Sequence, residues 1–320
     1  MKHSPLLSAS QTRTIATLPN QVGPIAYGFW RFAGTSVKEA REKVELALEL
    51  GMNFFDHADI YGCDGGGQFG DAEALFGEVL KEAPHLREQC LLATKGGIVL
   101  GRPYDSSFDY LSQAVERSLN RLNVDLIDLY QIHRPDFLTH PAALADTLEK
   151  LKESGKVKAF GVSNYTVAQT RALQAHLSFP LVSTQPEWSC FQTQALRDGT
   201  LDLSMELGLT PLGWSPLAGG KLAWNDQRIA QEVKEGNLQQ VQAQCLRNTC
   251  QVLDRIAQEQ NLSRAAVAIA WAMAHPAQVI PIIGTQNLSR MRDCAQALKC
   301  KLSRELWNEV LVASQGYPLP

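Results

Sequence analysis

The sequence lacks any hydrophobic run long enough to cross a membrane. Its longest apolar stretch, from Ala265 to Ala274, is much shorter than the roughly 18 to 20 residues that a membrane-spanning helix needs. The first residues, MKHSPLLSASQTRT, contain one short apolar pair before the sequence turns polar, so they do not have the hydrophobic core of a signal peptide. We therefore expect no association with a membrane.

The chain also lacks an excess of positive charge. Its 320 residues include 30 Lys and Arg against 33 Asp and Glu, which gives a formal net charge of −3. A surface that binds nucleic acid usually needs a strong positive charge to contact the phosphates. This balance argues against a nucleic-acid-binding protein. The 45% share of hydrophobic residues argues equally against a disordered chain.

Cysteine pairs and clusters of metal ligands are missing as well. The seven cysteines are an odd number, and no two of them form a C-x-x-C pair. The histidines do not cluster at the spacing of metal ligands, so we predict no metal site. Reduced thiols are typical of the cytoplasm, which is where we expect the protein to act.

The sequence does contain a regular alternation of short apolar runs and amphipathic stretches. Eight short runs are mainly apolar, as strands buried on both faces of a sheet are. They cover residues 24–29, 52–55, 90–94, 126–132, 159–162, 181–184, 210–213 and 279–283. Helical periodicity covers residues 36–50, 71–81, 108–122, 142–154, 167–176, 195–207, 241–260, 264–275, 288–298 and 304–313. Strands that alternate with helices predict a parallel α/β sheet.

The number of these units predicts a (β/α)8 TIM barrel. No Pro-, Gly- or Ser-rich linker divides the chain, so we expect a single domain over residues 1–320, with the barrel proper at about 22–300. An open, doubly wound sheet is the alternative. Residues 13–18, followed by Pro19 and Asn20 as a turn, predict an N-terminal hairpin that caps one end of the barrel. The last helical stretches predict extra C-terminal helices, and residues 62–70, 101–107 and 218–236 predict loops at the barrel mouth.

Three polar residues follow successive predicted strands directly. Asp56, Lys95 and His133 each come at the end of an apolar run, and barrel enzymes carry their chemistry at the carboxyl ends of the strands. Taken singly, each has an ordinary structural explanation as a cap or a solvated side chain. Together, an acid, a base and an imidazole would meet at one barrel mouth, where shifted pKa values are expected.

Tyr61 adds a phenol five residues after Asp56. A phenol can donate a proton to a carbonyl oxygen, but its usual pKa near 10 is high for transfer at neutral pH. An ammonium about 4 Å away attracts a phenolate by about 4 kcal/mol at an effective dielectric of about 20, or roughly 3 pKa units. We therefore expect Lys95 to lower the pKa of Tyr61, and Asp56 to hold Lys95 by an ion pair.

At these residues the sequence resembles the aldo-keto reductase family, and in particular its bacterial oxidoreductase branch. The resemblance covers nearly the whole chain and rests on motifs in the family's order and spacing. These are FDHADIYG (55–62), TKGG (94–97), IHRPD (132–136), GKVKAFGVSNY (155–165), WSPLAGG (214–220) and IPIIGT (280–285). One departure is His57, which stands where the family often has a small Thr or Ser.

The resemblance implies a barrel that binds NADPH across its C-terminal mouth and reduces aldehydes or ketones to alcohols. Asp56, Tyr61, Lys95 and His133 would be catalytic, with Tyr61 as the general acid and His133 orienting the carbonyl oxygen. The nicotinamide would stack on Trp214. The residues expected to hold the cofactor are Ser163, Asn164, Gln185, Trp214, Ser215, Leu217, Gly219, Lys221, Gly284, Thr285, Gln286 and Arg290. Trp30 and His133 would line the pocket for a small-molecule carbonyl substrate.

NADPH is expected over NADH because residues 284–290 contain no carboxylate and offer Arg290 to a 2′-phosphate. The family's usual state is a monomer. Two other functions stay open. One is a Schiff-base, aldolase-type barrel with Lys95 as the nucleophile, and the other is a non-catalytic, NADPH-sensing subunit of a larger assembly.

Overall fold

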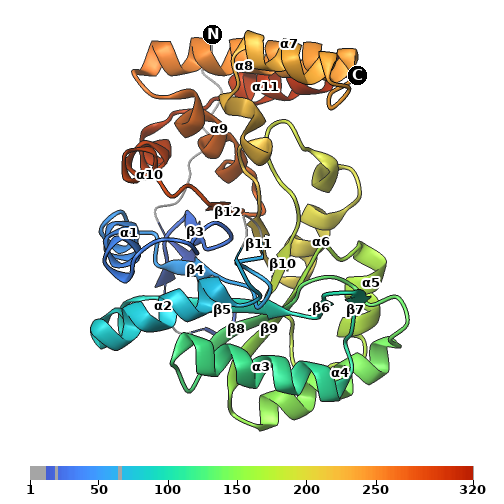
Figure 1. Ribbon diagram of the computed structural model, residues 1–320. Coiled ribbons are helices and arrows are strands. Elements are labelled where there is room, and N and C mark those ends of the chain that lie inside the picture. Colours follow the sequence, from blue (N-terminus) through green and yellow to red (C-terminus); the bar gives the residue numbers. More distant parts are fainter. Residues whose placement is uncertain (1–11, 19–20, 64–66, 320) are drawn as a thin grey trace.

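Eight parallel strands close into a barrel in a computed structural model that describes residues 12–18, 21–63 and 67–319. They are β3 (Ala26–Gly28), β4 (Phe54–Asp56), β5 (Leu91–Gly96), β8 (Ile127–Ile132), β9 (Val157–Ser163), β10 (Ser183–Gln185), β11 (Thr210–Gly213) and β12 (Ile280–Ile283). Neighbours in the barrel follow the order of the chain, and β12 pairs with β3 to close it (Figure 1). The predicted (β/α)8 barrel is confirmed, and the open sheet is excluded.

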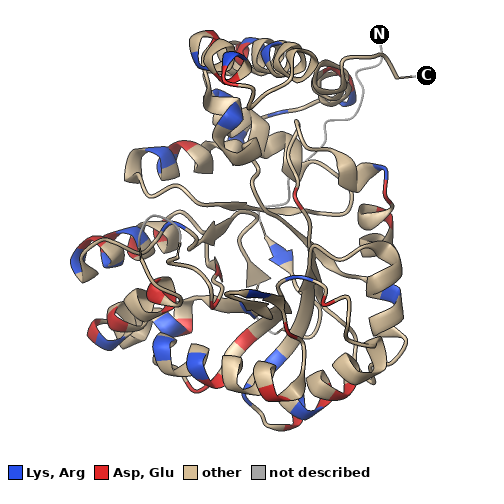
Figure 2. Cartoon of the chain, turned by 45° about the vertical axis from the view of Figure 1, so that its right-hand side comes forward, with Lys and Arg blue, Asp and Glu red and all other residues tan. Residues whose placement is uncertain are grey.

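Helices surround the barrel, as the periodicity predicts. They are α1 (Val37–Glu49), α2 (Asp71–Glu82), α3 (Phe108–Leu122), α4 (Pro141–Glu153), α5 (Val167–Gln174), α6 (Thr200–Leu207), α9 (Arg264–Met273) and α10 (Leu288–Ala295). Short 3₁₀ turns cover Pro84–Gln89, Gln194–Leu196, Ala218–Ala223 and Gln296–Lys299. Ser36 begins α1 with a capping box, in which its hydroxyl and the Glu39 carboxylate each accept from the other residue's backbone N–H, and such caps fix a helix start. Charged residues lie mainly on the outer helices (Figure 2).

Additional helices form a layer outside the ring, at the top of Figure 1. They are α7 (Asp226–Lys234), α8 (Gln240–Gln260) and α11 (Arg304–Gln315). Trp271 of α9 and Trp307 of α11 stack with ring centroids 4.6 Å apart, and each indole N–H donates to the backbone carbonyl of the other residue. This reciprocal contact joins the layer to the barrel. None of the helices in the described part of the chain combines the length and hydrophobicity that crossing a bilayer would take.

An N-terminal hairpin closes the end of the barrel opposite the mouth. Strands β1 (Arg13–Thr14) and β2 (Gln21–Val22) pair antiparallel, and the predicted turn at Pro19 and Asn20 lies outside the described residues. Ile15, Leu18 and Val22 are buried against the first residues of the barrel strands, including Phe54 and Leu91. The predicted cap is therefore confirmed as an apolar plug.

Three local predictions were wrong. The expected helix over residues 195–207 is divided into the turn at Gln194–Leu196 and α6, because Gly199 takes a left-handed φ of 82° that ends one helix before the next begins. The expected loop over 101–107 begins inside a small hairpin of β6 (Ile98–Val99) and β7 (Arg102–Tyr104). The loop over 218–236 contains α7. Of the loop over 62–70, residues 64–66 are not described.

Candidate active site

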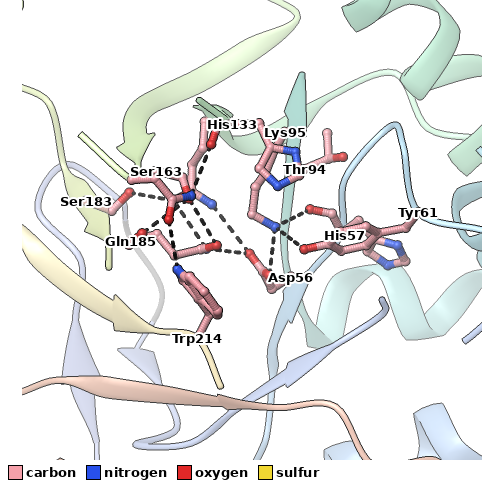
Figure 3. Close-up of polar contacts among 12 residues, drawn as sticks. Asp56, His57, Tyr61, Thr94, Lys95, His133, Ser163, Ser183, Gln185 and Trp214 are labelled. Carbon is pink, nitrogen blue, oxygen red and sulfur yellow. Dashed lines mark hydrogen bonds and ion pairs between the residues drawn. The ribbon is translucent and has the colours of Figure 1, made fainter. Parts of the chain in front are cut away.

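The four residues predicted to be catalytic meet at the mouth of the barrel. Asp56 ends β4, Tyr61 lies in the loop after it, Lys95 lies near the end of β5, and His133 follows β8 directly. Lys95 Nζ lies 2.8 Å from Asp56 Oδ2 and 3.0 Å from the Tyr61 hydroxyl (Figure 3). The rings of Tyr61 and His133 meet edge to face, with centroids 6.0 Å apart. The predicted ion pair between Lys95 and Asp56 is present.

Lys95 is a completely buried ammonium whose hydrogens are all used. Its Nζ donates to Asp56 Oδ2, to the His57 backbone carbonyl at 2.8 Å and to the Tyr61 oxygen. Burial opposes the charge, but the Asp56 carboxylate and the Tyr61 phenol outweigh it and raise the pKa of Lys95. A lysine that stays charged in this way is a source of positive potential and a poor nucleophile.

Tyr61 accepts a hydrogen bond and keeps its own proton. Since Lys95 donates to the phenol oxygen, the Tyr61 O–H is left for another acceptor, and it donates to no group in the described residues. Burial raises the pKa of Tyr61, and the Lys95 charge lowers it by a smaller amount. The net lowering expected from the sequence was therefore wrong, because that argument left out the desolvation of the phenol.

His133 is held as a neutral imidazole. Burial, followed by the charges of Lys95 and Arg134, lowers its pKa well below the usual value. Its backbone is fixed on both sides, because His133 N donates to the Gly96 carbonyl at 2.9 Å and Asn164 Nδ2 donates to the His133 carbonyl at 3.3 Å. A neutral ring in this position can donate or accept one hydrogen bond at the mouth without adding charge.

Gln131 is a site residue that the sequence reasoning missed. Its Nε2 lies 3.4 Å from Asp56 Oδ1, and its Oε1 accepts from the Ser183 hydroxyl at 3.3 Å. Gln185 Nε2 lies 2.9 Å from the same Asp56 oxygen. The signal was available, because side chains alternate along a strand and a polar residue two before His133 must share its face inside the barrel.

Four of the predicted cofactor residues form one connected group (Figure 3). Ser163 ends β9, Asn164 follows it, Gln185 ends β10, and Trp214 follows β11. Trp214 Nε1 donates to Asn164 Oδ1 at 3.1 Å, Asn164 Nδ2 to Ser163 Oγ at 2.8 Å, and Ser163 Oγ to the Gln185 carbonyl at 3.2 Å. Because Gln185 also contacts Asp56, this group lies beside the four residues predicted to be catalytic, which we call the tetrad.

The next predicted cofactor segment is a loop of left-handed residues. Ser215, Ala218, Gly219 and Gly220 have φ angles of 53°, 52°, 67° and 95°. Such conformations create concavities lined by backbone N–H groups. Lys221 follows and is half-buried, and its ammonium makes no hydrogen bond or ion pair with any residue between 12 and 319 that the structure describes. Leu217, also predicted here, is half-buried and packs on the main core.

The remaining predicted residues lie farther along the rim. Gly284, Thr285 and Gln286 follow β12, and the Tyr27 hydroxyl donates to Gln286 Oε1 at 3.4 Å. A surface cavity of about 310 Å³ at the start of α10 is lined by Ser289, Arg290, Arg292, Asp293 and Gln296. Trp30 follows β3 with 43% of its surface exposed, and the Arg31 guanidinium covers its ring at 4.8 Å.

Comparison with known proteins places the chain in one family. The model of the aldo/keto reductase family matches residues 24–313. The chain belongs to the aldo/keto reductase family, and its relatives include reductases and other oxidoreductases. It is 48% identical over 301 residues to the 6-dehydroglucose reductase of Novosphingobium aromaticivorans, covering 93% of this chain and 94% of that one.

Two further relatives agree with this assignment. The 6-dehydroglucose reductase of Agrobacterium fabrum is 36% identical over 308 residues, with 92% of this chain and 95% of the relative covered. The solved structure of the glycerol dehydrogenase AKR11B4 from Gluconobacter oxydans superimposes with a TM-score of 0.84 at 25% identity, over 98% of each chain. The expected resemblance to bacterial oxidoreductases is thereby confirmed.

Proposed function

We propose that this protein reduces the carbonyl group of a small, hydroxylated substrate to an alcohol, with NADPH as the hydride donor and Tyr61 as the general acid. The observation that carries the proposal is the hydrogen bond from Lys95 to the Tyr61 oxygen at 3.0 Å. It holds the phenol in place and leaves the Tyr61 proton for a substrate oxygen. The alternatives of a Schiff-base lyase and of a non-catalytic sensor give different results in the tests below.

The residues at the mouth fit a nicotinamide dinucleotide. Amide and hydroxyl groups of Ser163, Asn164 and Gln185 lie beside the half-buried indole of Trp214, which suits a flat ring that carries a carboxamide. The left-handed loop before Lys221 suits a pyrophosphate. When bound, the nicotinamide supplies the hydride.

Arg290 carries the proposed preference for a 2′-phosphate. It lies in the cavity at the start of α10 and has no hydrogen bond or ion pair from its side chain to any described residue. Its neighbour Arg292, by contrast, pairs with Glu49 at 3.3 Å. An arginine without a fixed partner is available for a phosphate, to which it can donate two hydrogen bonds at once.

The protein's own residues handle the proton. His133, as a neutral imidazole, holds the substrate carbonyl oxygen near the Tyr61 hydroxyl, and Tyr61 donates its proton to that oxygen as the hydride arrives. Lys95 stabilises the phenolate that remains, because an ammonium at 3.0 Å in a buried site attracts an anion strongly. Asp56 keeps Lys95 charged and oriented.

The names of the relatives support the class of substrate. Two of them are 6-dehydroglucose reductases, at 48% and 36% identity, and a structural neighbour at 25% identity is a glycerol dehydrogenase. We propose an aldehyde on a polyhydroxylated carbon chain, with 6-dehydroglucose as the first compound to test. The compounds in these names are small molecules that carry several hydroxyl groups.

The experiment measures NADPH oxidation with 6-dehydroglucose and with 4-nitrobenzaldehyde. Tyr61→Phe is expected to lose at least about 100-fold in kcat, the usual contribution of a general acid, while NADPH still quenches the Trp214 fluorescence with unchanged affinity. The matched control is Tyr317→Phe at an exposed position. Full activity of Tyr61→Phe would remove Tyr61 from the mechanism, and wild-type protein that binds NADPH without any turnover would favour the sensor.

Two further measurements test the lysine and the cofactor. Borohydride with a carbonyl substrate is expected to leave Lys95 unlabelled, since its three hydrogens are donated and its pKa is raised; labelling would favour the lyase. Arg290→Ala is expected to weaken NADPH binding about 10-fold, the cost of one lost charge-assisted contact, and to leave NADH binding unchanged. Arg292→Ala, which removes the arginine paired with Glu49, is the control.

A further inference from the structure

Arg134 is a half-buried arginine at the barrel mouth whose side chain has no partner in the described part of the chain. It follows His133 directly, and its side chain makes no hydrogen bond or ion pair with any residue that the structure describes. Other half-buried arginines of the chain are fixed. Arg87 pairs with Asp128, Arg121 with Glu73, and Arg264 with two backbone carbonyls. A partly buried guanidinium without a partner has lost some of its hydrogen bonds to water, and a bound ligand can replace them.

The charge of Arg134 affects the two residues that are proposed to contact the substrate carbonyl, Tyr61 and His133. It acts on both Tyr61 and His133, lowering the pKa of each in addition to the larger effects of burial and Lys95. Since Arg134 is the residue after His133 at the end of β8, its guanidinium is carried by the same rim of the barrel. We therefore expect a substrate whose carbonyl lies at Tyr61 and His133 to come within reach of Arg134.

Glu187 is the acidic counterpart of Arg134, two strands farther along the rim of the barrel. It lies two residues after Gln185, and its backbone bridges to Trp214. Its carboxylate is half-buried and makes no hydrogen bond or ion pair within the described ranges. Burial raises the pKa of Glu187, and the charges of Lys221 and Arg134 oppose that rise.

Arg134 follows β8 and Glu187 follows β10, and only β9 lies between these two strands in the barrel. Their half-buried side chains do not form an ion pair with each other, so a gap separates the guanidinium from the carboxylate. The group that bridges such a gap must accept hydrogen bonds on one side and donate them on the other. Neighbouring hydroxyl groups do both. A carboxylate on the substrate would be attracted by Arg134 but repelled by Glu187, and an alkyl chain would leave both charges desolvated.

We infer that Arg134 and Glu187 select neutral substrates that carry hydroxyl groups next to the carbonyl, with Arg134 donating to one hydroxyl oxygen and Glu187 accepting from another hydroxyl. This inference rests on the proposed function and names the residues that determine its substrate class. Neither residue takes part in proton transfer. Because Arg134 is the smallest of the effects on the pKa values of Tyr61 and His133, their loss is expected to affect the recognition of hydroxyl groups much more than carbonyl reduction itself.

The experiment compares D-glyceraldehyde with propanal, two aldehydes of the same chain length of which only the first has hydroxyl groups. Arg134→Met and Glu187→Gln are each expected to lower kcat/KM for glyceraldehyde at least 10-fold, mainly through KM, and to change kcat/KM for propanal less than 3-fold. Such a loss corresponds to one or two hydrogen bonds to a charged group. The double variant is expected to lose less than the product of the two single losses, because both residues hold one substrate.

Matched controls come from an exposed ion pair on the outer helices, between Arg171 and Glu206. Arg171→Met and Glu206→Gln are expected to leave both substrates unaffected, and the Kd for NADPH is expected to be the same in all variants. Equal losses for glyceraldehyde and propanal, or no loss for either, would overturn the inference. If Arg134→Met weakened only glyoxylate, the site would be one for carboxylates. A wild type that reduces neither aldehyde nor 4-nitrobenzaldehyde would instead refute the proposed function.

Discussion

The imidazole of His57 stacks on the ring of Phe29, with the two centroids 3.7 Å apart and the planes at 25°. Phe76 also packs on His57, with the centroid of its ring 4.9 Å from the centroid of the imidazole. His57 is fully buried, and neither of its ring nitrogens has a hydrogen-bond partner among the described residues. Directly beside Asp56, this histidine therefore serves as a neutral aromatic core residue.

His57 makes the folded protein less stable as the pH falls. Burial, followed by the Lys95 charge, holds its pKa well below the usual value. Below about pH 6.5 the unfolded chain therefore binds a proton that the folded chain does not, and the free energy of unfolding falls by about 1.4 kcal/mol per pH unit for this group. Urea unfolding between pH 7 and 5 is expected to show a shallower decrease for His57→Phe than for the wild type.

The comparison with the wild type isolates this residue, because His133, whose pKa is also lowered, contributes equally in both proteins. His176→Phe, a change at an exposed histidine, provides the control and is expected to keep the wild-type slope. Identical slopes for His57→Phe and the wild type would mean that His57 is protonated in the folded state.

The raised pKa of Tyr61 predicts a broad pH profile for carbonyl reduction. A general acid acts while it is protonated, and burial raises the Tyr61 pKa above its usual value near 10. We therefore expect kcat/KM for an aldehyde to stay flat between pH 7 and 9 and to decrease only at higher pH. Steady-state rates in constant-ionic-strength buffers measure this. A decrease centred near pH 7 would restore the lowered pKa that the Lys95 charge alone predicts.

Gln131 is expected to support catalysis because its side chain is neutral and leaves Asp56 as the carboxylate that pairs with Lys95. Gln131→Glu places a second carboxylate close to Asp56 Oδ1, from which the amide now lies 3.4 Å away. Like charges at this distance raise the pKa of one carboxyl group and compete for Lys95, so kcat at pH 7 is expected to fall about 10-fold or more and to recover partly near pH 5.5. Gln131→Met keeps the volume without the charge and is expected to lose less than 5-fold at both pH values. Equal losses for the two variants would assign Gln131 a packing role.

The apolar runs in the sequence predict both the barrel and the position of the catalytic residues at one end of it. Apolar runs reveal buried strands, and Asp56, Lys95 and His133 stand where those runs end, so parallel strands bring them together. Gln131 sits inside such a run, and only the alternation of side chains distinguishes it from the apolar residues around it. The broken helix at Gly199 depends on one glycine conformation, which a helical pattern does not exclude.

What the sequence could not supply is burial and distance. The pKa of Tyr61 depends on two opposing effects, and the sequence gives the charge of Lys95 but not the desolvation that outweighs it. The same limit applies to Arg134 and Glu187. They are 53 positions apart in the chain, and only the closed barrel brings both to one mouth and leaves both without a partner among the described residues.

The N-terminal plug is expected to contribute to stability and not to catalysis. Ile15 is 1% exposed and packs among the residues that fill the amino-terminal end of the barrel, at the opposite end from Tyr61. Ile15→Ala is expected to lower the free energy of unfolding by about 2 to 4 kcal/mol, through lost burial and a residual cavity, while kcat/KM at 25 °C stays within 2-fold of the wild type. Thr14→Ala, at the exposed neighbouring position, is expected to change stability by less than about 0.5 kcal/mol. Urea denaturation and aldehyde reduction on the same preparations measure both quantities. A loss of activity without a loss of stability in Ile15→Ala would mean that the plug determines the geometry of the mouth through the strands.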